Sequence, residues 1–324
     1  MIRLGVLALL CFSIGPGIIQ SHAEEPYPNR TVRIIVPSSP GGVTDVLGRM
    51  VAQGLSQAWG TAVVVVNRPG ADEVTGLNAV AKAAADGYTL LVSTDASFTA
   101  GPHLHSEKLY DTLTDFTPIF DLGQITPVLC VPASVPVHSV AEFIAHAKAN
   151  PGTMNYASFG VGTYAHLSME EFKMLTGTDL LHVPYNGSAP AVLALLRGDV
   201  SATMINLNLV ANHAQSGAVR IIAAAGASRS TFRPDLPTIA ESGVPGFATG
   251  AWWGLFGPAN LPSGVVDKIR HDVAAYLRTP EIIKFFEDTT IEPVEKNPDQ
   301  FAQLIRDDYE HWGTLIKLVG VKHD

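Results

Sequence analysis

The feature that most constrains the fold is residues 27–55, where an apolar run leads through a Pro-Gly-Gly turn into an amphipathic run. Hydrophobic periodicity predicts a strand over 31–37 and a helix that starts at Thr44 or Asp45. Gly41 and Gly42 let the turn approach a ligand closely, and the first amides of a helix have no partner within it. A helix N-terminus carries about half a positive charge, so this turn suits an anion. No lysine follows the glycines, which excludes a nucleotide P-loop.

The first 23 residues have the pattern of a secretory signal peptide. Arg3 supplies the positive charge, residues 6–12 form a short apolar core, and the tripeptide Ser-His-Ala at 21–23 is a small-x-small cleavage motif. The apolar core is too short for a membrane span. We therefore expect a periplasmic protein that is cleaved near Ala23 and is not itself embedded in the membrane.

Cysteine usage and charge limit the class of protein further. Cys11 lies within the predicted signal peptide, so the mature chain would keep only Cys130 and could form no internal disulfide. Burial of apolar side chains must then stabilise the fold, and the chain is long enough for a core divided between two domains. The formal net charge of −9 and the absence of a basic run argue against nucleic acid as a partner.

Strand-like and helix-like runs alternate over most of the chain, which predicts an α/β protein with mainly parallel sheets. The runs at 116–122 and 128–132 flank a crossing into a second lobe, and the run at 220–225 carries the chain back. We expect residues 24–125 and 228–324 to form lobe 1, with helices at 265–277 and 298–319, and residues 126–227 to form lobe 2. Two lobes joined by crossing strands make a hinged cleft for a small solute.

Seven segments, in order along the chain, carry a resemblance to a known family. They are YPNRTVRIIVPSSPGGVTDVLGRMVAQGLS, VVNRPGA, AVAKAAADGYTLLVST, SVAEFIAHAKANPGTMNYASFGVGTYAHL, HVPYNGSAPAVLALLRGDV, RPDLPTIAESGVPGF and WWGLFGPANLPSGVV. In these segments the chain resembles the periplasmic substrate-binding receptors of tripartite tricarboxylate transporters, the TctC-like or Bug-type proteins. The similarity covers nearly all of the mature chain.

The resemblance implies a two-lobed periplasmic-binding-protein fold of the type II class, with two crossing strands at the hinge. It also implies a receptor that is not an enzyme and that uses no cofactor. Such a receptor closes around a small aliphatic or aromatic mono- or dicarboxylate and delivers it to a membrane permease. We expect it to act as a monomer.

The resemblance further implies that the ligand lies between loops of the two lobes. The candidates in lobe 1 are Ser39, Pro40, Gly41, Gly42, Thr44 and Asp45 after the first strand, and Thr94, Asp95 and Ser97 after a later one. The candidates in lobe 2 are Gly160, Gly162, Thr163, His166 and Asn206. These loops contain no Lys or Arg, so carboxylate binding would depend on backbone amides, hydroxyls and ordered water.

Several candidates also have a structural interpretation. A carboxylate that faces a carboxylate ligand is repulsive, so we expect Asp45 to order its loop or a bridging water instead of contacting the ligand. Thr163 suits a helix cap, Asn206 suits a strand-end cap, and His166 suits a structural hydrogen bond. We expect the aromatic side chains near the loops, Tyr164 among them, to serve mainly in packing.

The chain departs from the family pattern at a few positions. Asp72 and Glu73 stand where the family has a glycine-rich run, and Asn206 stands where many members carry Asp. Asn186 replaces a lysine that is common in the family. If Asp72 and Glu73 lie in a solvated loop, they have no effect on the choice of ligand. If they turn inward, they favour a ligand that carries an amine or fewer negative charges.

Other chemistries are less well supported by the sequence. His166 and Glu170 have the i, i+4 spacing of a metal pair, but without a third ligand we expect no metal site. An exported hydrolase would use Ser158, yet the surrounding Tyr-Ala-Ser-Phe-Gly lacks the first glycine of a nucleophile elbow. A receptor for a signalling partner stays an alternative to transport, because both need a cleft that closes.

Overall fold

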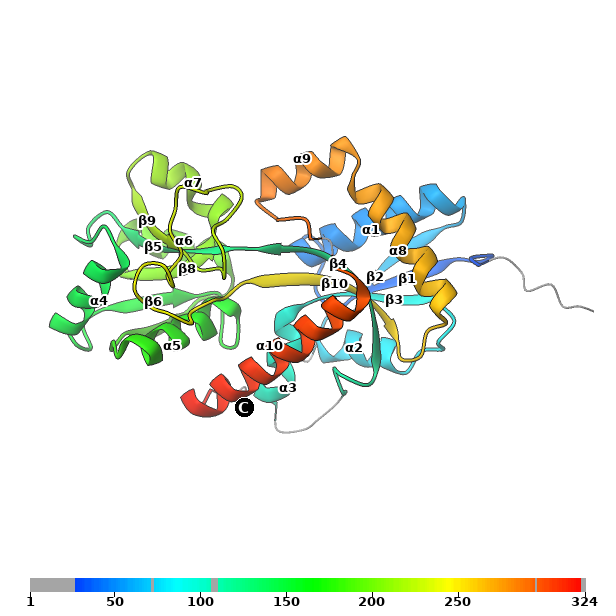
Figure 1. The fold of residues 1–324 in the computed structure, drawn as a ribbon, viewed down its shortest axis with the longest axis horizontal. Coiled ribbons are helices and arrows are strands. Elements are labelled where there is room, and N and C mark those ends of the chain that lie inside the picture. The colour runs from blue at the N-terminus through cyan, green and yellow to red at the C-terminus, as the bar shows by residue number, and fades with distance from the viewer. Residues whose placement is uncertain (1–26, 71–72, 106–109, 295, 322–324) are drawn as a thin grey trace, which may run out of the picture.

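The computed structural model of the chain describes residues 27–70, 73–105, 110–294 and 296–321. The predicted signal peptide lies outside these ranges. Two five-stranded sheets, each with its own helices, lie end to end along the longest axis of the molecule (Figure 1). Among the described residues, no helix combines the length and the apolarity needed to cross a membrane.

The first sheet has the strand order β2-β1-β3-β10-β4. Its strands are β1 (Val32–Val36), β2 (Val63–Asn67), β3 (Thr89–Thr94), β4 (Phe116–Ile125) and β10 (Ala251–Pro258). The helices on this side are α1 (Val43–Trp59), α2 (Val74–Ala81), the π-helix η1 (Ala96–Ala100), α3 (Gly101–Leu104), α8 (Ser263–Leu277), α9 (Pro280–Thr289) and α10 (Pro298–Val319). The predicted first strand and the two predicted C-terminal helices are confirmed as β1, α8 and α10.

The second sheet has the strand order β7-β6-β8-β5-β9. Its strands are β5 (Pro127–Pro132), β6 (Asn155–Ser158), β7 (Leu181–Pro184), β8 (Ala202–Asn206) and β9 (Val219–Ala224). The helices around it are α4 (Val140–Ala149), α5 (Tyr164–Thr176), α6 (Ser188–Arg197) and α7 (Leu207–Gln215).

Both sheets are mixed, and in each the parallel pairs and the antiparallel pairs are arranged in the same way. β1 runs parallel to β2 and β3, and β6 runs parallel to β7 and β8, as the alternation of strands and helices predicts. The antiparallel ladders all involve the strands that join the lobes. β10 lies antiparallel between β3 and β4, and β5 lies antiparallel between β8 and β9. A strand that crosses from one sheet to the other does not return through a covering helix, so it is free to pair antiparallel.

The hinge consists of two extended segments that lie side by side (Figure 1). β4 ends at Ile125 and β5 begins at Pro127, so the chain crosses with almost no loop. The return crossing leads into β10, where Ala251 pairs with Ile125.

The limits proposed for the lobes stay a prediction, but packing bears on the return at residue 228. After β9, apolar side chains still bury against the second sheet, among them Ile239, Val244 and Phe247. The ring of Phe247 lies edge-on to that of Phe172 in α5, with centroids 6.1 Å apart. The segment between β9 and β10 therefore contributes to the core of the second sheet before the chain returns to the first.

α10 connects the two cores. Trp312, Leu315 and Ile316 pack in one cluster with Leu104 of the first side and Leu167 of α5. Figure 1 shows α10 lying across the front of the molecule towards α5. The two lobes are therefore held by the hinge and also by this helix.

The tightest helix packing on the first sheet is that of α1 on α8. A Cβ placed on Gly54 of α1 would lie 2.3 Å from Cγ of Tyr276, so the glycine is required for the close approach. We expect Gly54→Ala to lower the free energy of unfolding by about 1–3 kcal/mol through overpacking. Urea denaturation measures this effect.

The matched control is Gly264→Ala in α8, where an added Cβ meets nothing within 4 Å. Because alanine favours a helix over glycine by up to about 1 kcal/mol, this variant should be neutral or slightly stabilised. Equal unfolding midpoints for Gly54→Ala and the unaltered protein would contradict the tight packing of the two helices.

Candidate functional site

The loop after β1 is organised by a buried carboxylate. Asp45 is 4% exposed, and its Oδ2 accepts a hydrogen bond from the backbone N–H of Gly41 at 3.0 Å. The guanidinium of Arg49 donates to both carboxylate oxygens, and Asn67 at the end of β2 donates to Oδ1 at 2.8 Å. These bonds, that from Arg49 above all, lower the pKa of Asp45 to about 2. The loop-ordering role predicted for Asp45 is thus visible in the structure.

The start of α1 is open to solvent. The helix begins at Val43, one residue before the predicted start, and its N-cap Gly42 supplies no side-chain cap. The loop residues Ser39, Pro40, Gly41 and Gly42 are all exposed. A Cβ on Gly42 would meet nothing within 4 Å, so the space beside this N-cap residue is empty of protein. By contrast, Ser139 accepts from the first turn of α4 and fills that helix start.

Thr44 fixes this helix start to the centre of the sheet. The indole N–H of Trp253 in β10 donates to its Oγ1 at 3.2 Å, and both residues are buried. Thr44 is therefore an anchor of the loop, and its own backbone N–H belongs to the open first turn.

The loop after β3 brings two hydroxyls to the edge of the sheet where the loop after β1 also lies. The hydroxyls of Thr94 and Ser97 lie 3.1 Å apart, and Ser97 also donates to Oε2 of Glu73. Glu73, at the N-cap of α2, has φ +73° and turns its carboxylate towards this loop. Of the two acidic residues that depart from the family pattern, Glu73 therefore contacts a candidate residue, while Asp72 lies outside the described residues.

Asp95 differs from the other candidates of lobe 1. Its side chain is buried, and this burial raises its pKa well above the usual range. The nearby charge of Asp308 raises the pKa further. The structure therefore places its carboxyl inside the lobe, near α10. Ser97 is buried as well, which leaves the half-buried Thr94 as the more accessible of the three candidates in this loop.

In lobe 2 the loop after β6 is shaped by two left-handed glycines. Gly160 has φ +137° and Gly162 has φ +78°. The N–H of Gly162 donates to Nδ1 of His166 at 3.1 Å, and the hydroxyl of Thr163 donates to the carbonyl of Gly160 at 2.8 Å. Thr163 is the N-cap of α5, but its side chain closes the loop instead of capping the helix. The first turn of α5 is therefore uncapped, like that of α1.

His166 belongs to a stack of rings inside lobe 2. Its ring lies 4.0 Å from that of His182 at an interplanar angle of 11°, and His182 stacks in turn on Tyr156. Nε2 of His182 lies 2.6 Å from Oγ of Ser158, and burial lowers the pKa of His182. The structure thus gives His166 a structural hydrogen bond and a packing role behind the loop.

Tyr164 brings the two lobes together at the site. Its hydroxyl donates to Oδ1 of Asn206, the N-cap of α7, and its ring packs against the cluster of the first sheet that contains Trp253. Burial raises the pKa of Tyr164, and the charge of Asp95 raises it further. The sequence predicts mainly a packing role for Tyr164, and the packing is present; the hydrogen bond to Asn206 was missed, although the position of Tyr164 directly after Thr163 at a helix start was a signal for it.

Separate contacts link the starts of α1, α5 and α7: Tyr164 bonds to Asn206 at the start of α7 and packs on the cluster that contains Trp253, and Trp253 bonds to Thr44 at the start of α1. All three helices lack a side-chain cap, and the hydroxyls of Thr94 and Ser97 lie at the same strand ends. Backbone amides at helix starts, with hydroxyls beside them, bind anions without an ion pair. Among the described residues, no three His, Cys, Asp or Glu side chains gather as a metal site.

Comparisons with known proteins agree with this architecture. The model of the tripartite tricarboxylate transporter family receptor matches residues 47–321. Protein BugT of Bordetella pertussis is 36% identical over 307 residues, which cover 94% of each chain.

Solved structures of similar sequence have the same fold as this chain. R. palustris Rpa4515 with adipate is 34% identical with a TM-score of 0.77, over 91% of this chain and 98% of that one. MatC (Rpa3494) from Rhodopseudomonas palustris with bound malate is 28% identical with a TM-score of 0.74, over 90% of this chain and 100% of that one. The predicted periplasmic-binding-protein fold is confirmed, and the chain belongs to the tripartite tricarboxylate transporter receptor family.

Proposed function

We propose that this protein captures a small carboxylate between its two lobes and delivers it, unaltered, to the permease of a tripartite tricarboxylate-type transporter. The observation that carries the proposal is that Tyr164, at the uncapped start of α5, bonds to Asn206 at the uncapped start of α7 and packs on the first-sheet cluster whose Trp253 holds Thr44 at the uncapped start of α1. The ligand class is an aliphatic or aromatic mono- or dicarboxylate. Relatives of the same fold were solved with adipate and with malate.

The proposed contacts divide the candidates into two groups. The residues that would face the ligand are Ser39, Pro40, Gly41 and Gly42 of the first loop, Thr94, Gly160, Gly162, Thr163 and Asn206. The buried Thr44 would contribute its backbone N–H, and the buried Ser97 would hold Thr94 in place. Asp45 and His166 would act behind their loops, because each holds a loop glycine by a hydrogen bond. Asp95 would support its loop from inside the lobe.

Amide-based binding is strong enough for a transport receptor. Each helix start contributes about 0.3–1 kcal/mol to the binding of a charge at an exposed site, and up to about 2 kcal/mol in a partly buried one. Hydrogen bonds to a charged group add about 1.5–3 kcal/mol each. Several such contacts in a closed cleft reach about −8 kcal/mol, which corresponds to micromolar affinity.

We also propose that the chain is exported to the periplasm, with cleavage near Ala23, and that it acts as a monomer. The family consists of periplasmic receptors, and a receptor that shuttles single ligands to a permease needs no second copy.

Isothermal calorimetry across a panel of mono-, di- and tricarboxylates tests the proposal, with uncharged amides of the same acids as controls. We expect at least one carboxylate to bind with about micromolar affinity and its amide not to bind. If no carboxylate in a broad panel binds or raises the melting temperature, the proposal fails.

Gly42→Leu separates binding from folding. Gly42 has φ −77°, which leucine adopts readily, and its Cβ would enter open space, so we expect an unchanged free energy of unfolding. The side chain would occupy the space in front of the first amides of α1 and should weaken carboxylate binding at least about tenfold, or about 1.4 kcal/mol. Gly264→Leu, at an equally open helical position, should leave the affinity unchanged. Normal affinity in Gly42→Leu would show that the ligand lies elsewhere.

Asp45→Asn should loosen the first loop. The amide loses the charge that pairs with Arg49 and replaces one of the two acceptor oxygens by an NH2 donor, so it cannot accept from Gly41, Arg49 and Asn67 together. We expect a loss of about 1–3 kcal/mol of stability and weaker ligand binding at neutral pH. The folded pKa of about 2 lies below the unfolded value of about 3.9, so this stabilisation is present above pH about 4. It is lost as the pH falls through about 2, so the stability difference between the two proteins should shrink there. A difference that is constant with pH would contradict the ionised role of Asp45.

One observation favours the alternative of a hydrolase, the 2.6 Å contact between Oγ of Ser158 and Nε2 of His182. Ser158 is completely buried, its hydroxyl also donates to the carbonyl of Gly160, and no carboxylate of the described residues hydrogen-bonds to His182. We therefore expect no turnover of a p-nitrophenyl ester panel by the unaltered protein. Turnover that Ser158→Ala abolishes while the variant stays folded would establish the enzyme instead.

A further inference from the structure

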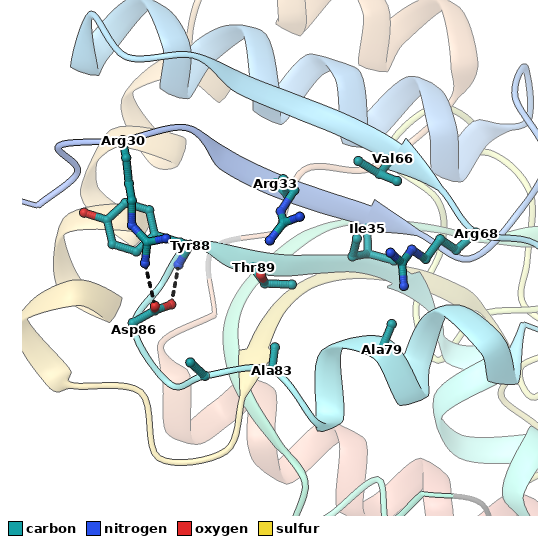
Figure 2. Close-up of a pocket in the computed structure, with 11 residues that line it drawn as sticks. Arg30, Arg33, Ile35, Val66, Arg68, Ala79, Ala83, Asp86, Tyr88 and Thr89 are labelled. Carbon is teal, nitrogen blue, oxygen red and sulfur yellow. Dashed lines mark hydrogen bonds and ion pairs between the residues drawn. The ribbon is translucent and has the colours of Figure 1, made fainter.

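A basic groove lies on lobe 1, on the face of the first sheet beside α2 (Figure 2). Its volume is about 360 Å³, and β1, β2 and β3 form its floor. Three arginines line it from one end to the other, Arg30, Arg33 and Arg68. None of them is among the candidate residues of the interlobe site.

The groove exists because α2 is short. The helix has eight residues, and the chain directly after it lines the groove with the small side chains of Ala83 and Ala84 before Asp86 and Tyr88 close one end. The sheet face around Arg33 and its neighbour Thr89 is left uncovered as a result. Strands of parallel sheets are normally apolar and covered on both faces, and the other four residues of β1 are buried. Arg33 is the exposed exception in this strand.

The charges in the groove are only partly compensated. Arg30 forms an ion pair with Asp86 at 2.9 Å and lies over the ring of Tyr88, with its guanidinium carbon 4.0 Å from the ring centroid. Arg33 and Arg68 have no side-chain hydrogen bond or ion pair with any described residue. Figure 2 shows both guanidinium groups lying over the floor of the groove. Two uncompensated positive charges thus share one groove on a chain whose net charge is −9.

We propose that this groove docks an extended acidic segment of a partner protein. Val36 pairs with Asn67 across the two strands, so Arg68 lies opposite residue 37, four residues along from Arg33. At about 3.3 Å per residue the two arginine backbones are about 13 Å apart along the strand direction. An extended segment with acidic residues four positions apart has the same spacing.

The open form of the groove favours a protein segment over a free small anion. All three arginines are exposed, whereas pockets for small ligands bury most of the ligand surface. A single exposed ion pair contributes little because water and salt screen it. A segment that makes several such pairs, and that is held by the rest of its own protein, adds them together.

The test uses a fluorescein-labelled peptide with two Glu-Ser-Gly-Ser-Glu repeats, followed by anisotropy at about 20 mM and about 150 mM salt. We expect the unaltered protein to bind it, more tightly at the lower salt. The double variant Arg33→Glu, Arg68→Glu should lose at least tenfold in affinity and should gain binding of the peptide in which lysine replaces glutamate. Arg68→Glu alone, in a loop, gives an intermediate loss and does not alter a strand.

The matched control is the double variant Arg197→Glu, Arg306→Glu, which makes the same change in net charge at exposed positions of α6 and α10. It should bind the acidic peptide as the unaltered protein does. Carboxylate binding in the interlobe cleft should be the same in all variants, so the outcome is independent of the proposed receptor function. The inference is overturned if the unaltered protein does not bind the peptide at low salt or if both double variants lose affinity equally. It is also overturned if citrate or phosphate binds at these arginines and the peptide does not.

Discussion

The site depends on one buried carboxylate. Asp45 joins three parts of lobe 1, because it accepts from Gly41 in the loop, pairs with Arg49 one turn further along α1, and accepts from Asn67 at the end of β2. The Arg49 guanidinium cancels its charge, so an acidic side chain next to a proposed anion site does not repel the ligand. The exposed surface of the loop is then backbone amide, with the partial positive charge of the helix start in front of it.

The local parts of this arrangement could be predicted from the sequence, and the long-range parts could not. The strand, the glycine turn and the amphipathic helix at residues 27–55 specify β1, its loop and α1, because periodicity and glycine conformation act over a few residues. The insertion of β10 between β3 and β4 pairs segments more than about 120 residues apart, which no local pattern encodes. The same reason explains why the sheets are mixed where the alternation of elements indicated mainly parallel ones.

In the candidate site, too, the local features could be predicted from the sequence and the long-range ones could not. The exposed glycines and the loop-ordering role of Asp45 follow from residues near one another in the chain. The raised pKa of Asp95 depends first on its burial and then on the charge of Asp308 in α10, and the ring stack behind His166 depends on the register in which Tyr156 pairs with His182. The partners of Tyr164, which are Asn206 and the cluster around Trp253, come from distant strands, so its own segment predicts packing but not the hydrogen bond. When contacts with another element determine the role of a side chain, the sequence of its own segment does not predict that role.

The lobes of this structure are in contact, and those contacts define what opening would require. The chain crosses between the sheets beside the paired residues Ile125 and Ala251, and both are buried in the core of the first sheet, so opening must bend the chain beside them and leave that core intact. α10 must slide on α5, since Trp312 and Ile316 share a cluster with Leu167 and His311 pairs with Glu171 at 3.3 Å. Tyr164 must leave the cluster of the first sheet. Small apolar contacts and a partly exposed ion pair are weak enough to break and reform, so a ligand that joins the helix starts of both lobes would shift the balance towards the closed form.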